Sequence, residues 1–244
     1  MSKTPAGFAP DWPAPPGVRA WVTERGPGAG RYGSLNLATH VGDAPDEVAA
    51  NRARLRRALS LPAEPDWLEQ VHGTRVLDLD RERIEPADGA VTGEVGVVCV
   101  VMTADCLPVL LADRQGRRVG VAHAGWRGLA GGVLPAAVRA LHVPPEQILA
   151  WLGPAIGPMA YEVGAEVRDA FVAASPAAAE HFVANARGRW QADLEGLARD
   201  SLMSAGVAAI FGGGLCTYAE SARFFSHRRE APCGRMATLI WKEC

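Results

Sequence analysis

The sequence lacks the features that mark membrane and nucleic-acid partners. No apolar run reaches the roughly 18–20 residues that a membrane helix needs. The formal net charge is only -2, which gives no general reason to expect nucleic acid or an acidic membrane surface as a partner. The segment 1–20 contains no apolar core of a secretory signal, so we expect a cytoplasmic protein.

Cysteine is scarce. The five cysteines are an odd number, stand far apart in the sequence and form no CxxC pair. A disulfide framework is therefore not expected, and a thiol is left for chemistry.

The order of the expected elements favours a layered fold. Hydrophobic residues make up 48% of the 244 residues, enough for a substantial core. Strands and helices alternate irregularly, with hairpins and without βαβ repetition, which is typical of an α+β or mixed α/β fold with a mixed sheet. No change of composition marks a boundary, so we expect a single domain over residues 1–244, with the Pro- and Gly-rich segment 1–17 on the surface. The predicted strands outside the central stretch cover 18–23, 67–77 with an interruption at Gly73, 148–152, 207–211 and 237–241; the predicted helices cover 45–59, 125–141, a stretch from about 165, and 193–205.

The stretch 97–133 organises the rest of the chain. It predicts an apolar strand, a polar elbow with Asp105 and Cys106, a second strand, a tight turn, and a third strand that ends in His123. If residues 114–115 form a two-residue turn, Cys106 lies opposite His123, and a three-residue turn with a bulge would shift this register by one position. Directly opposed residues have Cβ atoms roughly 4.5–5.5 Å apart, close enough to share a metal ion or a proton.

His72 joins this pair as a third soft ligand. In the segment 67–77, a period of two places Gln70 and His72 on one face. Two imidazoles and one thiolate suit zinc, and three protein ligands leave the fourth position open for water or substrate. Copper also accepts nitrogen and sulfur donors. The alternatives are a metal-free Cys106–His123 dyad with a thiolate nucleophile, and residues with only a structural role.

Two arginines are candidates for binding an anion. The predicted helix 45–59 has an apolar stripe that includes Arg52, so its guanidinium either extends from the edge of the core or points at an anionic ligand. Arg127 lies in a Gly-rich bend at a helix start, where exposed amides and the guanidinium favour an anion. The bend matches neither a P-loop nor GxGxxG, so it specifies no nucleotide motif.

A set of motifs occurs in order along nearly the whole chain, from about residue 18 to the end. The motifs are SLNLATHVGD with NR at 51–52, QVHGTRV, TADCLPVLL, VAHAGWRGLAGGV, LGPAIGPMAYEVG, and FFSHRRE with GR at 234–235. With them the sequence resembles the laccase-domain family of the bacterial YfiH type, whose members are also named polyphenol oxidases or peptidoglycan editing factors. The resemblance implies a four-layered mixed α/β fold and zinc ligands at His72, Cys106 and His123.

The resemblance further implies phosphorolysis of adenosine, inosine and methylthioadenosine, adenosine deamination alongside, and phenol oxidation by some members when copper is bound. For phosphorolysis, we expect Arg52, Arg127 and Arg228 or Arg229 to bind the phosphate. Asp105 is the nearest candidate for an acid–base group, and the alternative is that it orients a ligand or caps the elbow. The predicted catalytic residues are Cys106, His123, Asp105 and Arg127, and the predicted substrate contacts are Asn36, Arg52, Gln70, Thr217 and Arg228.

The sequence also departs from two familiar patterns. The usual zinc deaminases carry HxE and PCxxC, whereas His72 precedes Gly73-Thr74 and Cys106 has no CxxC partner. With six histidines and no HxH pair, the chain does not provide the ligands of a true multicopper laccase. Copper in the zinc site would still give slow phenol oxidation.

Two other functions fit the same residues. The first is a cysteine amidohydrolase that uses Cys106 as nucleophile and His123 as base on a peptide or muropeptide. The second is a non-enzymatic partner of cell-wall synthesis enzymes with a structural zinc, against which the open coordination position argues. We therefore predict a monomeric zinc enzyme whose partners are a purine nucleoside and phosphate.

Overall fold

The computed structural model describes residues 5–28 and 30–243. Its strands are β1 (Gly7–Phe8), β2 (Val18–Thr23), β3 (Asp66–Trp67), β4 (Val76–Asp78), β5 (Gly89–Thr92), β6 (Val98–Thr103), β7 (Leu107–Asp113), β8 (Val119–Ala124), β9 (Ile148–Leu152), β10 (Glu162–Val163), β11 (Phe182–Ala184), β12 (Trp190–Ala192), β13 (Ala209–Gly212) and β14 (Met236–Lys242). Its α-helices are α1 (Pro45–Ala58), α2 (Trp126–Gly131), α3 (Val133–Ala140), α4 (Ala165–Ala174), α5 (Leu194–Ser204) and α6 (His227–Glu230), with 3-10 turns at Pro145–Gln147 and Pro176–His181. Within these residues, no helix has the length and apolar character to cross a membrane.

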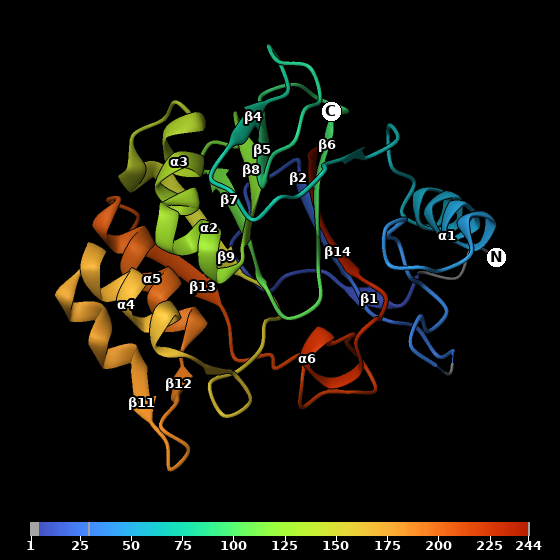
Figure 1. Ribbon diagram of the computed structural model, residues 1–244. Helices are drawn as coiled ribbons and strands as arrows, with labels where there is room; N and C mark the ends of the chain where they lie inside the picture. The colour runs from blue at the N-terminus through green and yellow to red at the C-terminus, as the bar shows by residue number, and fades with distance from the viewer. Residues whose placement is uncertain (1–4, 29, 244) are drawn as a thin grey trace.

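Two mixed β-sheets form the centre of the fold (Figure 1). One has the strand order β13-β9-β7-β8-β5-β4 and the other the order β1-β2-β14-β6-β3, while β10-β12-β11 form a third, small sheet. Along the hairpin β7-β8, Leu110 and Val121 pack toward the five-stranded sheet, and Val109 and Ala122 pack toward the helices. Both faces of the hairpin are covered, which explains why its two strands are apolar without interruption.

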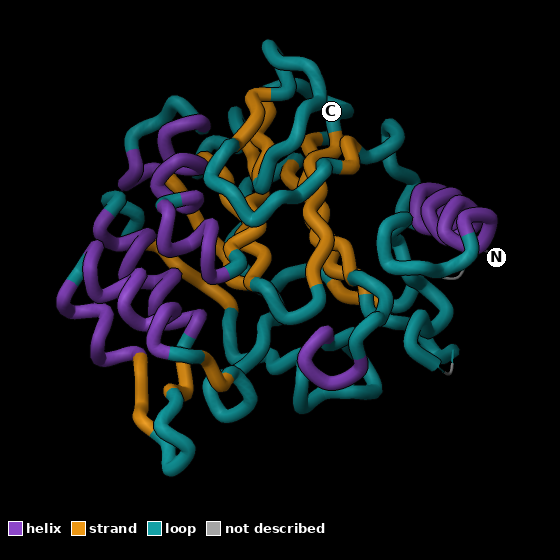
Figure 2. The backbone as a smooth tube through the Cα atoms, in the orientation of Figure 1, coloured by secondary structure: helices purple, strands orange, loops and turns teal. Residues whose placement is uncertain are grey.

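Helices cover the outer face of each large sheet. The helices α2, α3, α4 and α5 pack on the six-stranded sheet through a core that includes Leu134, Phe171 and Leu197 (Figure 2). On the other side, α1 and the loop before it cover the five-stranded sheet through a core that includes Leu37 and Leu55. The succession of helices, sheet, sheet and helix makes four layers, which confirms the predicted mixed α+β fold.

The register of the central hairpin differs from the prediction by two positions. Pro108, not Cys106, pairs with His123. The reason is the loop: the N–H of Asp113 donates to the carbonyl of Arg118 at 2.9 Å, so four residues, 114–117, lie inside this closing pair instead of two. A shift of two keeps every side chain on its face. Cys106 therefore still lies on the face of His123, directly before the first residue of β7.

Two predicted elements are interrupted in the structure. The segment 67–77 is mostly a loop between β3 and β4, and His72 within it has a φ of 57°, so strand alternation does not apply there. The predicted helix 125–141 is divided into α2 and α3, because Gly132 adopts a left-handed φ of 96° that ends the first helix.

Two segments predicted as irregular contribute to sheets. Residues 89–92, which lie outside the predicted strands, form the buried strand β5. The N-terminal segment is not confined to the surface, because β1 pairs with β2 and the ring of Phe8 lies 6.4 Å from that of Trp151. The part of this predicted surface segment at 1–4 lies outside the described residues.

Candidate metal centre and its cleft

Three side chains converge at one end of the six-stranded sheet. His72 lies in the loop between β3 and β4, Cys106 directly before β7, and His123 in β8. Their ligand atoms all lie within 4.8 Å of one another, and Cys106 Sγ is 3.9 Å from His72 Nε2. The two imidazole rings stand edge to face, with centroids 4.8 Å apart. The structure thus brings together the three side chains that the sequence predicts as ligands.

The space around these donors fits a metal ion. In tetrahedral zinc coordination a nitrogen and a sulfur ligand stand about 3.5 Å apart, so small side-chain movements bring this set to bonding distance. A Cβ atom added at Gly125 would lie 2.9 Å from His72 Cδ2 and 3.0 Å from Cys106 Sγ, so only glycine leaves room for both ligands. His123 is buried and His72 is exposed. The open side of the donor set therefore faces solvent.

A fully buried carboxylate, Asp88, orients His123. Asp88 Oδ1 accepts a hydrogen bond from His123 Nδ1 at 2.8 Å, which leaves Nε2 of the ring free to bind a metal. Burial acts to raise the pKa of Asp88, but hydrogen bonds from His123 and the Gly73 N–H outweigh it and lower the pKa. The carboxylate therefore stays ionised and fixes the tautomer of His123.

The same carboxylate shapes the loop that carries His72. The backbone N–H groups of Val71, His72 and Gly73 donate to Asp88 at 3.2, 2.9 and 2.6 Å. Successive N–H groups around one anion form a nest, and the left-handed backbone of His72, uncommon for a residue other than glycine, belongs to it. Asp88 therefore fixes the main chain of one ligand and the ring of another. In the sequence it precedes Gly89 and is indistinguishable from a turn residue.

Without a metal, Cys106 and His123 form a thiolate–imidazolium pair. Burial acts to raise the pKa of the Cys106 thiol, but the hydrogen bonds and charges of His123 and His72 lower it to about 6. Burial acts to lower the pKa of His123, but hydrogen bonds with Asp88 and Cys106 raise it to about 9. Between these two values the thiol is ionised and the ring is protonated. The thiolate is the form that binds metals.

A cleft of ≈ 310 Å³ opens over the three donors, a size suited to a small molecule. Five polar residues of the lining, His40, Thr103, Tyr161, His227 and Arg235, are absent from the residues that the sequence predicts for the site. Each of them lies within a motif that carries the family resemblance, and this position was the signal by which the sequence could have identified it as a site residue. The complete lining is His40, Gln70, His72, Met102, Thr103, Ala104, Asp105, Cys106, His123, Ile156, Tyr161, His227, Arg228 and Arg235.

Of the predicted substrate contacts, Gln70 and Arg228 line the cleft. Gln70 Nε2 donates to the carbonyl of Met102 at 2.9 Å, and Gln70 Oε1 accepts from the N–H of Met102 at 2.7 Å. The Arg228 guanidinium donates to the carbonyl of Glu162 at 2.9 Å and lies 5.6 Å from the centre of the Tyr161 ring. Both side chains therefore also hold the walls of the cleft together.

Asp105 and Thr217 stabilise the polar elbow. The fully buried Thr217 hydroxyl donates to Asp105 Oδ1 at 2.6 Å, and the backbone N–H of Arg228 donates to Asp105 Oδ2 at 2.7 Å. Since both carboxylate oxygens are engaged, the geometry favours the alternative prediction for Asp105, a cap on the elbow, over an acid–base role. The predicted substrate contact of Thr217 does not fit its burial.

Asn36 is likewise enclosed by protein. It is fully buried, and its amide donates to the carbonyl of Ala38 at 3.1 Å and to Asp43 at 2.9 Å. Its Oδ1 accepts the backbone N–H of Arg235 at 3.0 Å. A direct substrate contact, as predicted, does not fit this burial, and Asn36 is linked to the lining of the cleft by its hydrogen bond with Arg235.

Two of the predicted anion-binding arginines stack on tryptophans outside the lining of the cleft. The Arg52 guanidinium lies 4.0 Å from the centre of the Trp67 ring and donates to a main-chain carbonyl. The guanidinium of Arg127 lies 4.4 Å from the centre of the Trp126 ring. Their charges still act nearby, because Arg127 influences the pKa of Tyr161.

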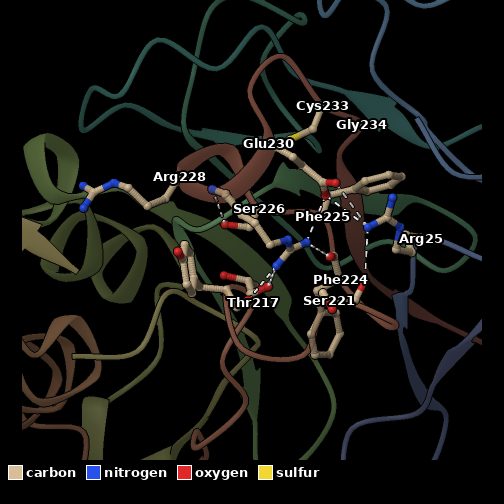
Figure 3. A network of polar contacts seen from close by, with 12 residues as sticks. Arg25, Thr217, Ser221, Phe224, Phe225, Ser226, Arg228, Glu230, Cys233 and Gly234 are labelled. Atoms are coloured by element: carbon tan, nitrogen blue, oxygen red, sulfur yellow. Dashed lines mark hydrogen bonds and ion pairs between the residues drawn. The ribbon is translucent and has the colours of Figure 1, made fainter. Parts of the chain in front are cut away.

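Both terminal nitrogens of Arg229 are engaged around α6. Its guanidinium donates to the carbonyls of Thr217 at 2.6 Å and Phe224 at 2.7 Å and pairs with Glu230 at 2.9 Å. Arg228 extends away from this network, as Figure 3 shows. Arg229 therefore does not provide the predicted phosphate contact.

Fold and donors together define a class, a layered α+β protein with a His, Cys, His donor set below an open cleft. The chain belongs to the laccase-like family of the YfiH type, since the family model described as multi-copper polyphenol oxidoreductase laccase matches residues 19–243. This family assignment implies metal binding.

Relatives with an assigned activity are similar over nearly the whole chain. The chain is 53% identical over 239 residues to a purine nucleoside phosphorylase of Pseudomonas aeruginosa, covering 97% of this chain and 98% of the relative. It is 51% identical over 238 residues to the purine nucleoside phosphorylase YfiH of Escherichia coli, covering 96% and 98%. These similarities support an enzyme.

Solved structures show the same fold. The Neisseria meningitidis protein NMB0706 is similar with a TM-score of 0.93 and 46% identity, covering 99% of this chain and 100% of that chain. The protein YlmD from Geobacillus stearothermophilus is similar with a TM-score of 0.91 and 33% identity, covering 99% and 98%.

The substitution Asp88→Asn is expected to weaken metal binding about 10- to 100-fold. The amide preserves the size of the side chain but removes the charge that fixes the His123 tautomer. Competition with a chromogenic chelator measures the affinity. The control is Asp113→Asn, because Asp113 is also fully buried and hydrogen-bonded, at the far end of β7. Equal affinities of the two variants would contradict the role of Asp88.

Proposed function

We propose that the protein is a metal-dependent purine nucleoside phosphorylase acting on adenosine, inosine and methylthioadenosine. The bond between ribose C1′ and purine N9 breaks, C1′ bonds to an oxygen of hydrogen phosphate, and the proton of that phosphate ends on the free base. The observation that carries the proposal is the cleft of ≈ 310 Å³ over the three donors. The 53% identity to a protein named as such a phosphorylase supports it.

Zinc is the proposed metal, held by His72, Cys106 and His123. Two imidazoles and one thiolate are ligands that zinc prefers, and a three-ligand set with an open position is typical of catalytic zinc. The bound ion would supply Lewis acidity at the floor of the cleft. Copper suits the same donors, which is compatible with the family description, and we assign slow phenol oxidation to that form.

The chain's own residues orient the reactants. Asp88 presents Nε2 of His123, Gln70 fixes the main chain of Met102, and Asp105 ties the elbow to the N–H of Arg228. Because most of these contacts reach backbone groups, the cleft is formed before a substrate arrives. Such preorganisation lowers the entropic cost of bringing phosphate and C1′ into line.

Tyr161 is the proposed hydrogen-bond donor to the departing base. It lines the cleft, and burial, followed by the negative charge of Cys106, raises the pKa of its phenol. The O–H therefore keeps its proton at neutral pH and acts as a permanent donor. A donor that meets charge developing on the purine stabilises the transition state more than the ground state.

Adenosine deamination is proposed as a lesser activity of the same centre. Attack of water on C6 of adenine needs an acid–base group, and the glutamate of the usual zinc deaminases is absent here. The carboxylate in the lining of the cleft is that of Asp105, whose oxygens are already engaged. This arrangement supports phosphorolysis as the main reaction.

We further propose that residues 1–244 act as one monomeric, cytoplasmic domain. The core shared by both large sheets supports a single domain. Nucleic acid and membranes are not proposed as partners, since the net charge is only -2.

Chromatography of adenosine incubated with zinc-loaded protein, with and without phosphate, tests the main activity. We expect adenine only when phosphate is present, and none with Cys106→Ala, because the variant lacks one of the three ligands. Inosine as the sole product would instead make the protein a deaminase. No turnover in either sample would contradict both nucleoside activities.

The substitution Tyr161→Phe tests the donor to the base. It removes one hydroxyl and keeps the ring, so we expect kcat to fall about 10-fold while the zinc content stays the same. A matched control is Tyr218→Phe, because Tyr218 does not line this cleft. An unchanged kcat in Tyr161→Phe would remove this residue from the mechanism.

A cysteine amidohydrolase is the second candidate, favoured by one observation. Asp88 Oδ1 accepts a hydrogen bond from His123 Nδ1, and the ring of His123 presents a nitrogen within 4.8 Å of Cys106 Sγ. A thiol nucleophile, a base and an orienting carboxylate follow the same logic as a catalytic triad. The substrate of this activity would be a peptide or muropeptide amide.

Alkylation of Cys106 by iodoacetamide at different pH values distinguishes the two candidates. Since the pKa of Cys106 is lowered to about 6, labelling of chelator-treated protein should increase as the pH rises through 6 and not only near 9. Zinc-loaded protein should be protected at every pH. Half-buried Cys216 is the internal control, whose labelling should not respond to zinc. Equal labelling with and without zinc, together with amide hydrolysis, would favour the amidohydrolase.

A further inference from the structure

Arg235 presents unused hydrogen-bond donors at the cleft. Its Nη1 donates to the carbonyls of Cys233 at 2.7 Å and Gly234 at 3.2 Å. Its Nε and Nη2 make no hydrogen bond to the described residues, and none of their carboxylates forms an ion pair with it. Because the side chain also lines the cleft, its charge is available to a ligand there.

His40 lines the same cleft and experiences the same positive charge. Burial, then the charges of Arg235 and Arg52, lower the pKa of His40. Arg235 and Arg52 therefore lie close enough to act on His40 electrostatically. Asp105 is the carboxylate in the lining of the cleft, and hydrogen bonds engage both of its oxygens. An anion entering beside Arg235 and His40 thus meets a guanidinium that forms no ion pair with the described residues.

A buried network fixes the two segments that carry these groups. Asn36 accepts the backbone N–H of Arg235 at 3.0 Å, while the side chain of Asn51 in α1 donates to the carbonyl of Asn36 at 2.9 Å. The Nε of Arg52, also in α1, donates to the carbonyl of Leu37 at 2.9 Å. The start of β14, the segment that leads to His40 and α1 are thereby joined. Fixing these segments preforms the part of the cleft that Arg235 and His40 line.

We propose that Arg235 and His40 form the phosphate-binding subsite of the cleft, with Asn36 as a positioning residue; this inference rests on the proposed phosphorylase function. A guanidinium with free N–H groups matches the oxygens of a phosphate, and charge-assisted hydrogen bonds of this kind are stronger than neutral ones. The other candidates are less suitable: both terminal nitrogens of Arg229 bind main-chain carbonyls and Glu230, and neither Arg229 nor Arg127 belongs to the lining.

The assignment also orders the cleft. Arg228 donates to the carbonyls of Glu162 and Ala160, next to Tyr161, so this side of the cleft carries the proposed donor to the base. With phosphate at Arg235 and the purine at Tyr161, the ribose lies over the metal donors, which line the same cleft. Attack on C1′ from the side opposite to the departing purine requires such a separation of the two groups.

The substitution Arg235→Gln tests the subsite in zinc-loaded protein with inosine as substrate. We expect the KM for phosphate to rise roughly 10- to 100-fold, because a charge-assisted pair is lost, while the KM for inosine changes little. Arg235→Lys retains the charge and should restore part of the loss. His40→Gln should raise the KM for phosphate by a smaller factor. The control Arg56→Gln changes an exposed arginine of α1 and should leave both constants unchanged.

Calorimetric titration of inorganic phosphate alone into the same proteins separates this inference from the proposed function. Binding to the parent protein that is lost in Arg235→Gln would support the subsite even if no nucleoside turns over. Phosphorolysis with an unaltered KM for phosphate in Arg235→Gln would overturn the subsite and leave the phosphorylase function intact. Neither phosphate binding nor turnover in the parent protein would overturn both.

Discussion

The hydrogen bonds of the buried Asp88 carboxylate are the constraint on which the site depends. Asp88 lies directly before β5, and its carboxylate accepts hydrogen bonds from His123 Nδ1 in β8 and from three backbone N–H groups of the loop that carries His72. A buried charge is tolerated only when such partners surround it, and each donor left without its partner would cost about 1–3 kcal/mol. Ligand geometry and local stability are therefore coupled, because the interaction that aims the imidazoles also satisfies the buried carboxylate.

The layered fold brings distant parts of the chain to this point. The elbow before β7 emerges at the end of the two sheets, and Asp105 ties it to Thr217 and to the first turn of α6. Asn36 ties the segment before α1 to the start of β14. Sheet packing supplies the rigid base, and a few buried polar side chains set the position of each wall. Because buried polar side chains set the position of the walls, several residues of the family motifs are fully buried although they surround the cleft.

Apolar pattern was sufficient to predict most large elements, because β2, β9 and α5 each bury one face or lie wholly in the core. The apolar pattern did not predict the contacts between segments that are distant in the sequence. Four residues lie between the paired Asp113 and Arg118, where the sequence predicted two, and this shifts the register by two positions. The predicted pairing of Cys106 with His123 was therefore wrong. Their predicted position on one face of the sheet was right, because side chains alternate with a period of two. Asp88 was missed because Asp-Gly is also a turn signal. The burial of Asn36 was not predictable either, because its partner Arg235 lies 199 positions away in the sequence.

The donor set alone does not decide between the two activities associated with this family. Two imidazoles and a thiolate bind zinc and copper alike, and within residues 5–28 and 30–243 they form the one cluster of three such donors. Reduction of oxygen by a multicopper enzyme requires further copper sites, for which this cluster has no counterpart. The proposed phosphorolysis requires instead that an anion, a sugar and a base fit together above the donor set. Arg235 and Tyr161 both line the cleft, and they are the groups to which we assign the anion and the base. We therefore expect the walls around the metal ligands, more than the ligands themselves, to determine the reaction type in this fold.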